Sequence, residues 1–190
     1  MDDLPTLRCS NRKDWEDWLE VNHASAAGAW LELAKKGSPE STVSRPEALE
    51  AALCYGWIDG KAVSVDENFW KQRFTPRTRR SRWSRINREA ATRLIDAGMM
   101  KPSGLAEVEA ARRDGRWDAA YDSPRTMVAP EDFLRRLDEH PEARAFFDGL
   151  DSRNRYAILY RIQEAKRPAT RAKRIETYVS MLRERKTIYP

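Results

Sequence analysis

The chain has 190 residues and a net charge of +5, with 41% hydrophobic and 34% charged residues, a composition typical of a globular protein of one large or two small domains. With only two cysteines and two histidines in the chain, we expect no structural zinc site, and no apolar run approaches the ~18 residues that a membrane-spanning helix needs. The composition therefore predicts no metal, no cofactor and no membrane insertion.

Helix-start signals recur through the first part of the chain. Asn11 precedes an apolar stripe at helical spacing, which predicts a helix with Asn11 as its N-cap. Ser44 and Glu47 have the spacing of a capping box and predict a second helix. Ser84 is predicted to cap a third helix, and Pro102 stands where a fourth can begin.

Three segments have the pattern of strands, over residues 29–35, 57–65 and 69–74. A short turn over residues 66–68 joins the last two, which predicts an antiparallel hairpin. Gly60, inside the second segment, indicates a bulge or a close backbone approach. Together the segments predict one small antiparallel sheet, and the helix after the first strand also permits one parallel pair.

The last part of the chain has helical patterns only. Residues 119–129 contain serine and proline and predict a linker. Residues 131–139 then predict a short helix. Pro141 and Pro168 each stand at the start of a further helix, and Ser152 is predicted to cap the helix between them.

We therefore predict an α+β fold in two parts. Residues 1–118 form a domain with a small antiparallel sheet and helices, residues 119–129 form the linker, and residues 130–190 form an all-helical region packed on the first domain. The N-terminal residues are acidic and lack the apolar segment of a signal peptide, so we expect a cytoplasmic protein.

The positive charge is concentrated in two blocks. Residues 68–88 contain eight Lys and Arg residues and no acid, and residues 166–190 carry a net charge of +6. The other segments are acidic, at −6 for residues 1–67 and −3 for residues 89–165. Blocks of one sign raise the local potential and attract phosphates, nucleic acids or acidic protein surfaces.

The first basic block also contains aromatic residues, and arginine with aromatic side chains is the combination that sites for single-stranded nucleic acid use. Serines near the start of the third predicted helix are potential donors to an anion. A solvated loop packed against the acidic first part of the chain has the same sequence pattern. The anion-binding candidates are Arg73, Arg77, Arg79, Arg80, Arg82, Trp83, Ser84 and Arg85.

The second basic block spans a predicted helix break and the start of the last helix. One interpretation of this pattern is a solvated helix face. The other is an extension of the first binding surface, if the fold brings the two blocks together. The members of this second basic patch are Lys166, Arg167, Arg171, Lys173 and Arg174.

Trp57, Asp59 and Trp70 define a possible pocket on the predicted hairpin. Asp59 is either a ligand-contacting acid or general base in that pocket, or a buried carboxylate that pairs with an arginine of the hairpin. Cys54 lies near the end of a predicted helix, where the dipole disfavours a thiolate, so we expect a structural thiol. No phosphate-loop, dinucleotide-binding or hydrolase motif is present.

Several segments, in order, resemble one bacterial family. GWIDG at residues 56–60, FTPR-x-x-RSRWS at residues 74–84 and KRPATRAKRI at residues 166–175 resemble the YdeI/OmpD-associated family. The resemblance extends from about Trp15 to Leu182. It implies a role in bacteriocin protection and in tolerance of cationic antimicrobial peptides, in a family predicted to be periplasmic. The first part of the chain is also similar to the small α+β folds of YdhG-like and YjbR-like proteins.

Three hypotheses follow from these patterns. The first is a non-enzymatic cytoplasmic binding protein that contacts an anionic partner, such as a nucleic acid, a phosphate-containing ligand or an acidic protein, through the first basic block. The second is a nucleic-acid-binding protein, and the third is a small-molecule enzyme with a pocket around Asp59. A net-positive protein repels cationic peptides, so we expect any protective role to be indirect. The sequence leaves the oligomeric state open.

Overall fold

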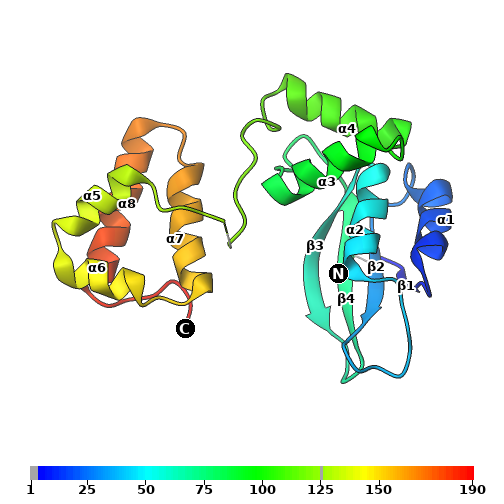
Figure 1. Ribbon diagram of the computed structural model, residues 1–190, viewed down its shortest axis with the longest axis horizontal. Coiled ribbons are helices and arrows are strands. Elements are labelled where there is room, and N and C mark those ends of the chain that lie inside the picture. The colour runs from blue at the N-terminus through cyan, green and yellow to red at the C-terminus, as the bar shows by residue number, and fades with distance from the viewer. Residues whose placement is uncertain (1–3, 125) are drawn as a thin grey trace. The chain divides into compact units, whose positions relative to one another are not determined.

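The computed structural model describes residues 4–124 and 126–190. The chain forms two compact units, residues 1–120 and residues 121–190, which we call unit 1 and unit 2. Unit 1 combines a mixed sheet with helices, and unit 2 is built from helices (Figure 1). The α+β fold class predicted from the sequence is confirmed.

The strands of unit 1 form one sheet. They are β1 (Thr6–Arg8), β2 (Ala29–Ala34), β3 (Trp57–Ser64) and β4 (Phe69–Pro76). Their order across the sheet is β1-β2-β4-β3. As predicted for the hairpin, β3 and β4 are antiparallel, and β4 is also antiparallel to β2. In contrast, β1 is parallel to β2.

β1 has no counterpart among the predicted strands, and it makes the sheet mixed rather than antiparallel throughout. It contains only three residues, too few to show an alternating pattern. A helix between β1 and β2 carries the chain back to the same end of the sheet, so the two strands run parallel. In β3 the pairing shifts register between Asp59 and Ala62, which confirms the bulge predicted at Gly60.

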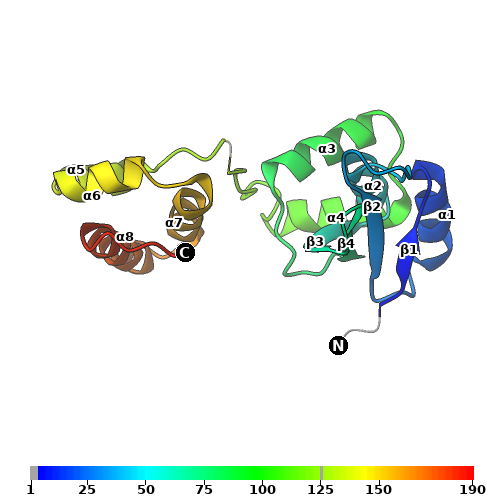
Figure 2. The same cartoon turned by 90° about the horizontal axis from the view of Figure 1, so that it is seen from below.

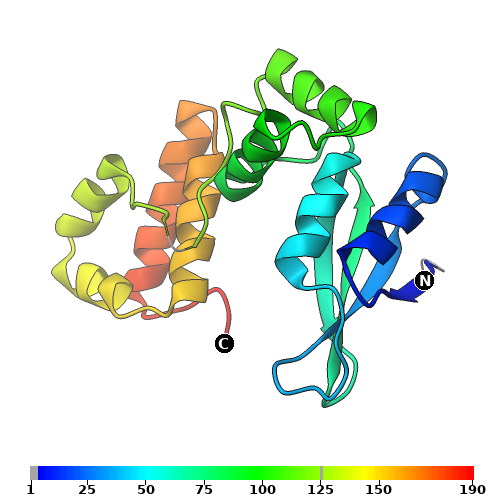
Figure 3. The ribbon, with the colours of Figure 1, turned by 45° about the vertical axis from the view of Figure 1, so that its right-hand side comes forward.

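The helices of unit 1 begin at the predicted caps. They are α1 (Arg12–Asn22), α2 (Arg45–Cys54), α3 (Arg85–Asp96) and α4 (Pro102–Arg113). The side chains of Asn11, Ser44 and Ser84 accept hydrogen bonds from backbone N–H groups in the first turns of α1, α2 and α3. At α2 the Glu47 side chain completes the capping box. Helices α3 and α4 gather toward one end of the strands (Figure 3).

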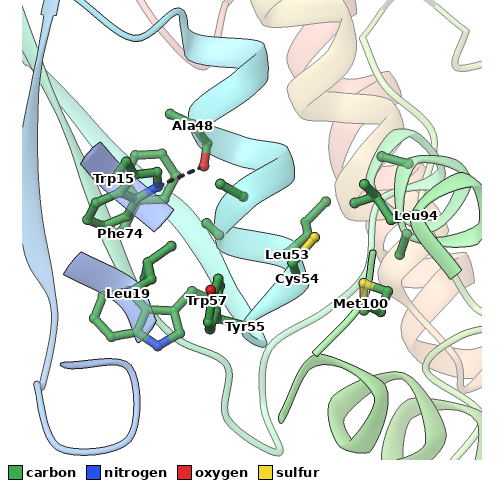
Figure 4. Packing of buried hydrophobic residues seen from close by; sticks show 14 of the residues in the cluster. Trp15, Leu19, Ala48, Leu53, Cys54, Tyr55, Trp57, Phe74, Leu94 and Met100 are labelled. Carbon is green, nitrogen blue, oxygen red and sulfur yellow. Dashed lines mark hydrogen bonds between the residues drawn. The ribbon is translucent and has the colours of Figure 1, made fainter. Parts of the chain in front are cut away.

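The core of unit 1 lies between the sheet and the helices α1 and α2 (Figure 4). Trp15 and Leu19 of α1 are fully buried, as the predicted apolar stripe requires. The Trp15 ring packs against Phe74 of β4 with 5.5 Å between ring centroids, and its Nε1 donates to the Ala48 carbonyl of α2 at 3.1 Å. One tryptophan thus joins α1, α2 and β4.

Helix α4 begins in direct backbone contact with the end of α2. The Lys101 backbone N–H donates to the Cys54 carbonyl at 3.0 Å. Gly104, in the first turn of α4, lies so close to this carbonyl that a Cβ atom there would be 2.2 Å from the Cys54 oxygen. Gly56 follows α2 with a φ of 77°, the left-handed conformation predicted after the helix end. Glycine at position 104 is therefore what allows α2 and α4 to meet.

The helices of unit 2 are α5 (Glu131–Asp138), α6 (Pro141–Asp148), α7 (Ser152–Glu164) and α8 (Pro168–Arg183). Phe133 and Phe147 form the centre of their core, edge to face with 5.2 Å between ring centroids. The cap predicted at Ser152 is wrong by one residue, because the Asp151 carboxylate accepts from the Asn154 backbone N–H instead. Within the described residues, no helix of either unit is long and apolar enough to cross a membrane.

Replacing Gly104 with alanine should destabilise unit 1. The added Cβ atom would overlap the Cys54 carbonyl oxygen, so α2 and α4 would have to separate, at a cost of about 1–3 kcal/mol in the free energy of unfolding. All seven tryptophans lie in unit 1, so urea unfolding followed by tryptophan fluorescence reports on this unit.

Gly149→Ala in unit 2 is the control for this substitution. A Cβ atom at Gly149 would come no closer than 3.6 Å to its neighbours, so its unfolding midpoint by circular dichroism should change little. An unchanged fluorescence midpoint for Gly104→Ala would show that the two helices do not depend on this close approach.

Candidate functional site

The basic stretch after β4 forms a structured turn over residues 77–83, which we call the arginine turn. Its first residue, Arg77, is 6% exposed, and its guanidinium carbon lies 3.5 Å from the centroid of the Trp83 ring. The Arg77 backbone N–H donates to the Gly56 carbonyl at 2.9 Å, and its Nη1 donates to the Arg82 carbonyl at 3.3 Å. Arg77 therefore holds the turn together from inside.

Trp83 belongs to the core of unit 1. It is 1% exposed, and its ring meets the Trp117 ring edge to face with 4.9 Å between centroids. The sequence pattern places Trp83 among the anion-binding candidates, as a ring on which a ligand stacks. In the structure Arg77 and Trp117 cover this ring, so its role is to support the turn.

Further contacts fix the arginine turn from outside. Ser81 Oγ accepts a hydrogen bond from the Thr78 backbone N–H at 2.9 Å, which closes a short loop. Arg116, just beyond α4, donates from Nη1 to the Ser81 carbonyl at 2.9 Å, and the Asp114 carboxylate holds its Nε at 2.9 Å. Ser84 Oγ serves as the N-cap of α3. The serines proposed as anion donors are thus engaged in shaping the backbone.

Arg79 and Arg80 are the candidates that the turn itself directs into solvent. Both are exposed, and neither forms an ion pair in the part of the chain that the structure describes. Arg85 is also exposed, in the first turn of α3, whereas Arg73 and Arg82 are partly buried. The adjacent guanidinium groups of Arg79 and Arg80, on a turn of fixed backbone, are suited to capture a phosphate or carboxylate.

Asp59 is engaged in an ion pair. Its Oδ2 accepts from Arg45 Nη2 at 2.8 Å, which ties β3 to the first turn of α2. Arg45 belongs to α2, so the prediction that Asp59 pairs with an arginine of the hairpin is wrong about the position of the partner. Trp57 is buried and donates from Nε1 to the His23 carbonyl at 3.1 Å, and Trp70 packs against the core cluster. Core packing and an ion pair therefore occupy the three side chains of the possible pocket.

Two arginines of the second basic patch cap the C-terminal end of α7. Arg171 Nη1 donates to the Ile162 carbonyl at 3.1 Å, and Arg174 Nη1 donates to the Arg161 carbonyl. Carbonyls in the last turn of a helix lack partners inside the helix, so these arginines cap it. Arg171 also forms a bidentate pair with Asp132 at 2.6 and 2.8 Å. That the two basic blocks form one surface stays a prediction. The exposed members of the patch are Lys166, Arg167 and Lys173.

A cavity of about 650 Å³ lies in unit 1 beside α1, where the sequence predicts no site. Tyr55 donates its hydroxyl to Glu20 Oε2 at 2.7 Å, and Lys101 Nζ lies 3.4 Å from the same oxygen. These contacts lower the pKa of Glu20, while burial and the bond to Glu20 raise the pKa of Tyr55. The phenol stays protonated and the carboxylate ionised near neutral pH. Tyr55 and Glu20 are 35 residues apart, and no sequence pattern connects them.

Cys54 lies in the wall of this cavity as a free thiol. It is 3% exposed, and burial raises its pKa to about 11. Because the thiolate is the nucleophile, Cys54 is unreactive near neutral pH, as expected for a structural thiol. Burial also raises the pKa of the free thiol of Cys9 to about 11. Among the described residues, no three His, Cys, Asp or Glu side chains are grouped so that they would hold a metal ion.

Unit 2 has a cavity of about 570 Å³ with a wall rich in tyrosine. Tyr156 and Tyr160 come from α7, and Tyr189 comes from the segment after α8. The guanidinium carbon of Arg153 lies 4.1 Å from the centroid of the Tyr189 ring. Tyr189 reaches α7 because Asn154 Oδ1 accepts from its backbone N–H at 2.9 Å, a long-range contact that sequence patterns do not reveal.

Comparison with family models divides the chain in two. Residues 7–107 match the model described as a domain of unknown function, DUF8412. The chain belongs to this family. The matched residues lie in unit 1 and include the sheet, the arginine turn and the lining of the cavity beside α1.

Residues 126–185 match the family described as "Bacteriocin-protection, YdeI or OmpD-Associated". This match lies in unit 2 and confirms the resemblance to the YdeI/OmpD-associated family over these residues. The resemblance seen in the sequence between Trp15 and Leu182 is broader, and its GWIDG and FTPR motifs fall in the part matched by DUF8412. No curated protein and no solved structure matches the chain.

Arg116 should be needed for the fixed shape of the arginine turn. Arg116→Met removes the donor to the Ser81 carbonyl, so we expect trypsin to cleave after Arg79 and Arg80 several-fold faster than in the unchanged protein. Mass spectrometry of brief digests measures the rate at each site. Arg113→Met removes a nearby exposed arginine and serves as the control. Equal rates in the two variants would show that other contacts hold the turn.

The two buried thiols should make unit 1 less stable as the pH rises above 9. Their pKa of about 11 in the folded protein exceeds the ordinary value of 9.0, so the unfolded chain loses these protons first. The stabilisation is complete below pH 9 and falls by on the order of 1 kcal/mol per thiol by about pH 10.

Urea unfolding followed by tryptophan fluorescence at about pH 8 and pH 10 measures this loss. The free energy of unfolding of the Cys9→Ala/Cys54→Ala variant is measured at the same two pH values. Between them it should fall by less than that of the unchanged protein. A loss of the same size in that variant would assign the pH dependence to other groups.

Proposed function

We propose that this protein is a non-enzymatic binding protein whose arginine turn holds an anionic partner. The observation that carries the proposal is the pair Arg79 and Arg80, two adjacent exposed guanidinium groups that form no ion pair among the described residues. Elsewhere in unit 1, Arg8 and Arg45 are matched with carboxylates. The guanidinium N–H groups of Arg79 and Arg80 are therefore able to donate to an external anion.

The contacts around the turn support this proposal. Arg77, Ser81 and Arg116 fix its backbone, so the exposed guanidinium groups are presented without a loop having to become ordered first. A fixed loop loses less conformational entropy on binding than a flexible one. The N-terminus of α3 follows in the same stretch, and its helix dipole also favours an anion.

The state of the reactive groups favours binding over catalysis. The Asp59 carboxylate is paired with Arg45, and Cys54 is a protonated, buried thiol. In the cavity beside α1, the shared hydrogen bond keeps Tyr55 protonated and Glu20 ionised. A general base must be free to accept a proton, and a nucleophile needs a pKa near the working pH. Asp59 is instead held in an ion pair, and the pKa of the Cys54 thiol lies well above neutral.

The match over residues 126–185 supports a bacteriocin-protection-like role at the level of the family. We infer that the protein contributes to such a role indirectly, because its net charge of +5 and its exposed arginines repel cationic peptides. A partner that carries phosphate or carboxylate groups is the ligand class that fits the arginine turn.

Replacing Arg79 and Arg80 with alanine should weaken binding to a polyanion. The probe is a short labelled oligothymidine, titrated by fluorescence anisotropy at about 50 and 200 mM salt. We expect the dissociation constant at the lower salt to rise roughly tenfold, since two charge-assisted contacts are lost. The slope of log K against log salt should fall by about 1.4, since each neutralised phosphate of a single strand contributes about 0.7.

Two further variants locate and characterise the site. Arg135→Ala/Arg185→Ala removes the same charge from exposed arginines of unit 2 and should leave most of the affinity intact. Arg79→Lys/Arg80→Lys keeps the charge but loses the paired donors, so it should recover only part of the affinity. If Arg79→Ala/Arg80→Ala and Arg135→Ala/Arg185→Ala weaken binding equally, net charge explains the binding and the arginine turn is not the site.

A further inference from the structure

Helices α1 and α2 cover one face of the sheet of unit 1, whose strands are seen from below in Figure 2, and the sheet has a second face opposite them. Side chains alternate between the faces of a strand, and Leu31 and Leu33 of β2 point into the core. Trp30 and Glu32 therefore lie on the other face, together with the residues paired to that side of β2. The outer face of β1, β2 and β4 includes Arg8, Trp30, Glu32, Phe69, Lys71 and Arg73.

Two aromatic rings lie on the outer face without belonging to the core. Trp30 is partly exposed and outside the core cluster of unit 1, and Lys71 Nζ lies 5.0 Å from the centroid of its ring. Phe69 is 5% exposed because the Arg8 guanidinium carbon lies 4.0 Å from its ring centroid. Trp30 is thus a partly exposed indole ring with the Lys71 ammonium over its face.

Charged side chains surround Trp30 on the outer face. Two carboxylates are matched there by Arg8: Glu32 accepts from Arg8 Nε and Nη2 at 3.0 and 2.9 Å, and Glu40 accepts from Arg8 Nη1 at 2.9 Å. Lys71 and Arg73 of β4 lie opposite Glu32 and Trp30. Arg73 crosses Gly60 of β3, where a Cβ atom would be 3.4 Å from its Nε. The glycine of the bulge therefore leaves room for this guanidinium along the sheet.

We propose that the outer face binds single-stranded nucleic acid, with a base stacked on Trp30 in place of the Lys71 ammonium and a phosphate held by Lys71. A ring and cations on one sheet face match the two parts of a nucleotide, since every base has a π surface and every linkage a negative charge. In a duplex the base faces are covered by their neighbours, so this arrangement selects unpaired strands. The site goes beyond the proposed function, which requires only an anion and uses the arginine turn.

The outer face and the arginine turn follow one another along the chain. Lys71 and Arg73 alternate on the outer face of β4, which ends at Pro76, and the arginine turn begins at the next residue. A nucleic acid strand that follows β4 from Lys71 past Arg73 is therefore led toward the turn. The two sites add different contributions, stacking at Trp30 and charge at the turn.

The test compares two single strands of equal length and charge, an oligothymidine and its abasic counterpart, by fluorescence anisotropy with the full chain at about 50 mM salt. We expect Trp30→Ala to weaken oligothymidine binding about tenfold and to leave the abasic strand unchanged, because only stacking is lost. Trp30→Phe keeps a ring and should recover most of the affinity. Bound oligothymidine should also quench tryptophan fluorescence, and much less so in Trp30→Phe.

Trp70→Ala is the matched control, because Trp70 is also partly exposed but packs against the core on the helix-covered face. It should leave both affinities unchanged once circular dichroism confirms the fold. The proposal is overturned if Trp30→Ala binds oligothymidine as well as the unchanged protein, if both strands lose affinity equally, or if the unchanged protein does not bind oligothymidine. Replacing Arg79 and Arg80 should weaken the binding of both single strands equally. The result therefore distinguishes a wrong assignment of the arginine turn from a wrong assignment of the outer face.

Discussion

The stack of the Arg77 guanidinium on Trp83 is the interaction on which the exposed basic part of unit 1 depends. The Trp83 ring covers the flat face of this buried guanidinium, and the Arg82 carbonyl accepts a hydrogen bond from its Nη1, so both offset part of the cost of burying the charge. The stack joins the two ends of a loop that like charges would otherwise extend. Part of the basic stretch therefore serves as structure, and this is what holds Arg79 and Arg80 outward.

Sequence patterns predicted the elements whose cause is local. The caps at Asn11 and Ser44 depend on residues three positions away, and the hairpin depends on the turn between its strands. β1 is absent from the predicted strands because its stability comes from pairing with β2 across α1, and three residues carry no sign of that. The mixed sheet thus depends on contacts between distant residues, whereas the positions of most helices and strands depend on neighbouring residues in the sequence.

The candidate site was predicted less completely because charge in a sequence does not reveal which arginines become buried. Arg77 and Arg79 have similar neighbours along the chain, but only Arg77 meets the Trp83 ring. Arg171 reaches a carbonyl nine residues earlier, a contact that requires α7 and α8 to pack. The strand pattern does not indicate that Trp30 lies at the surface, since tryptophans in strands are common in protein cores. Only the register between β2 and β4 shows that cations flank it.

Local pairing decides where the charge of unit 1 remains available. Residues 1–67 carry −6 and residues 68–88 carry +8, so the two segments nearly cancel in total. Several of the acids are matched close by: Glu16 and Glu20 of α1 lie against Arg12 and Lys101, and Glu32 of β2 lies against Arg8. Arg79 and Arg80, in contrast, form no ion pair among the described residues. A small net charge is therefore compatible with local attraction of an anion, because the acids are neutralised at other positions than the arginine turn.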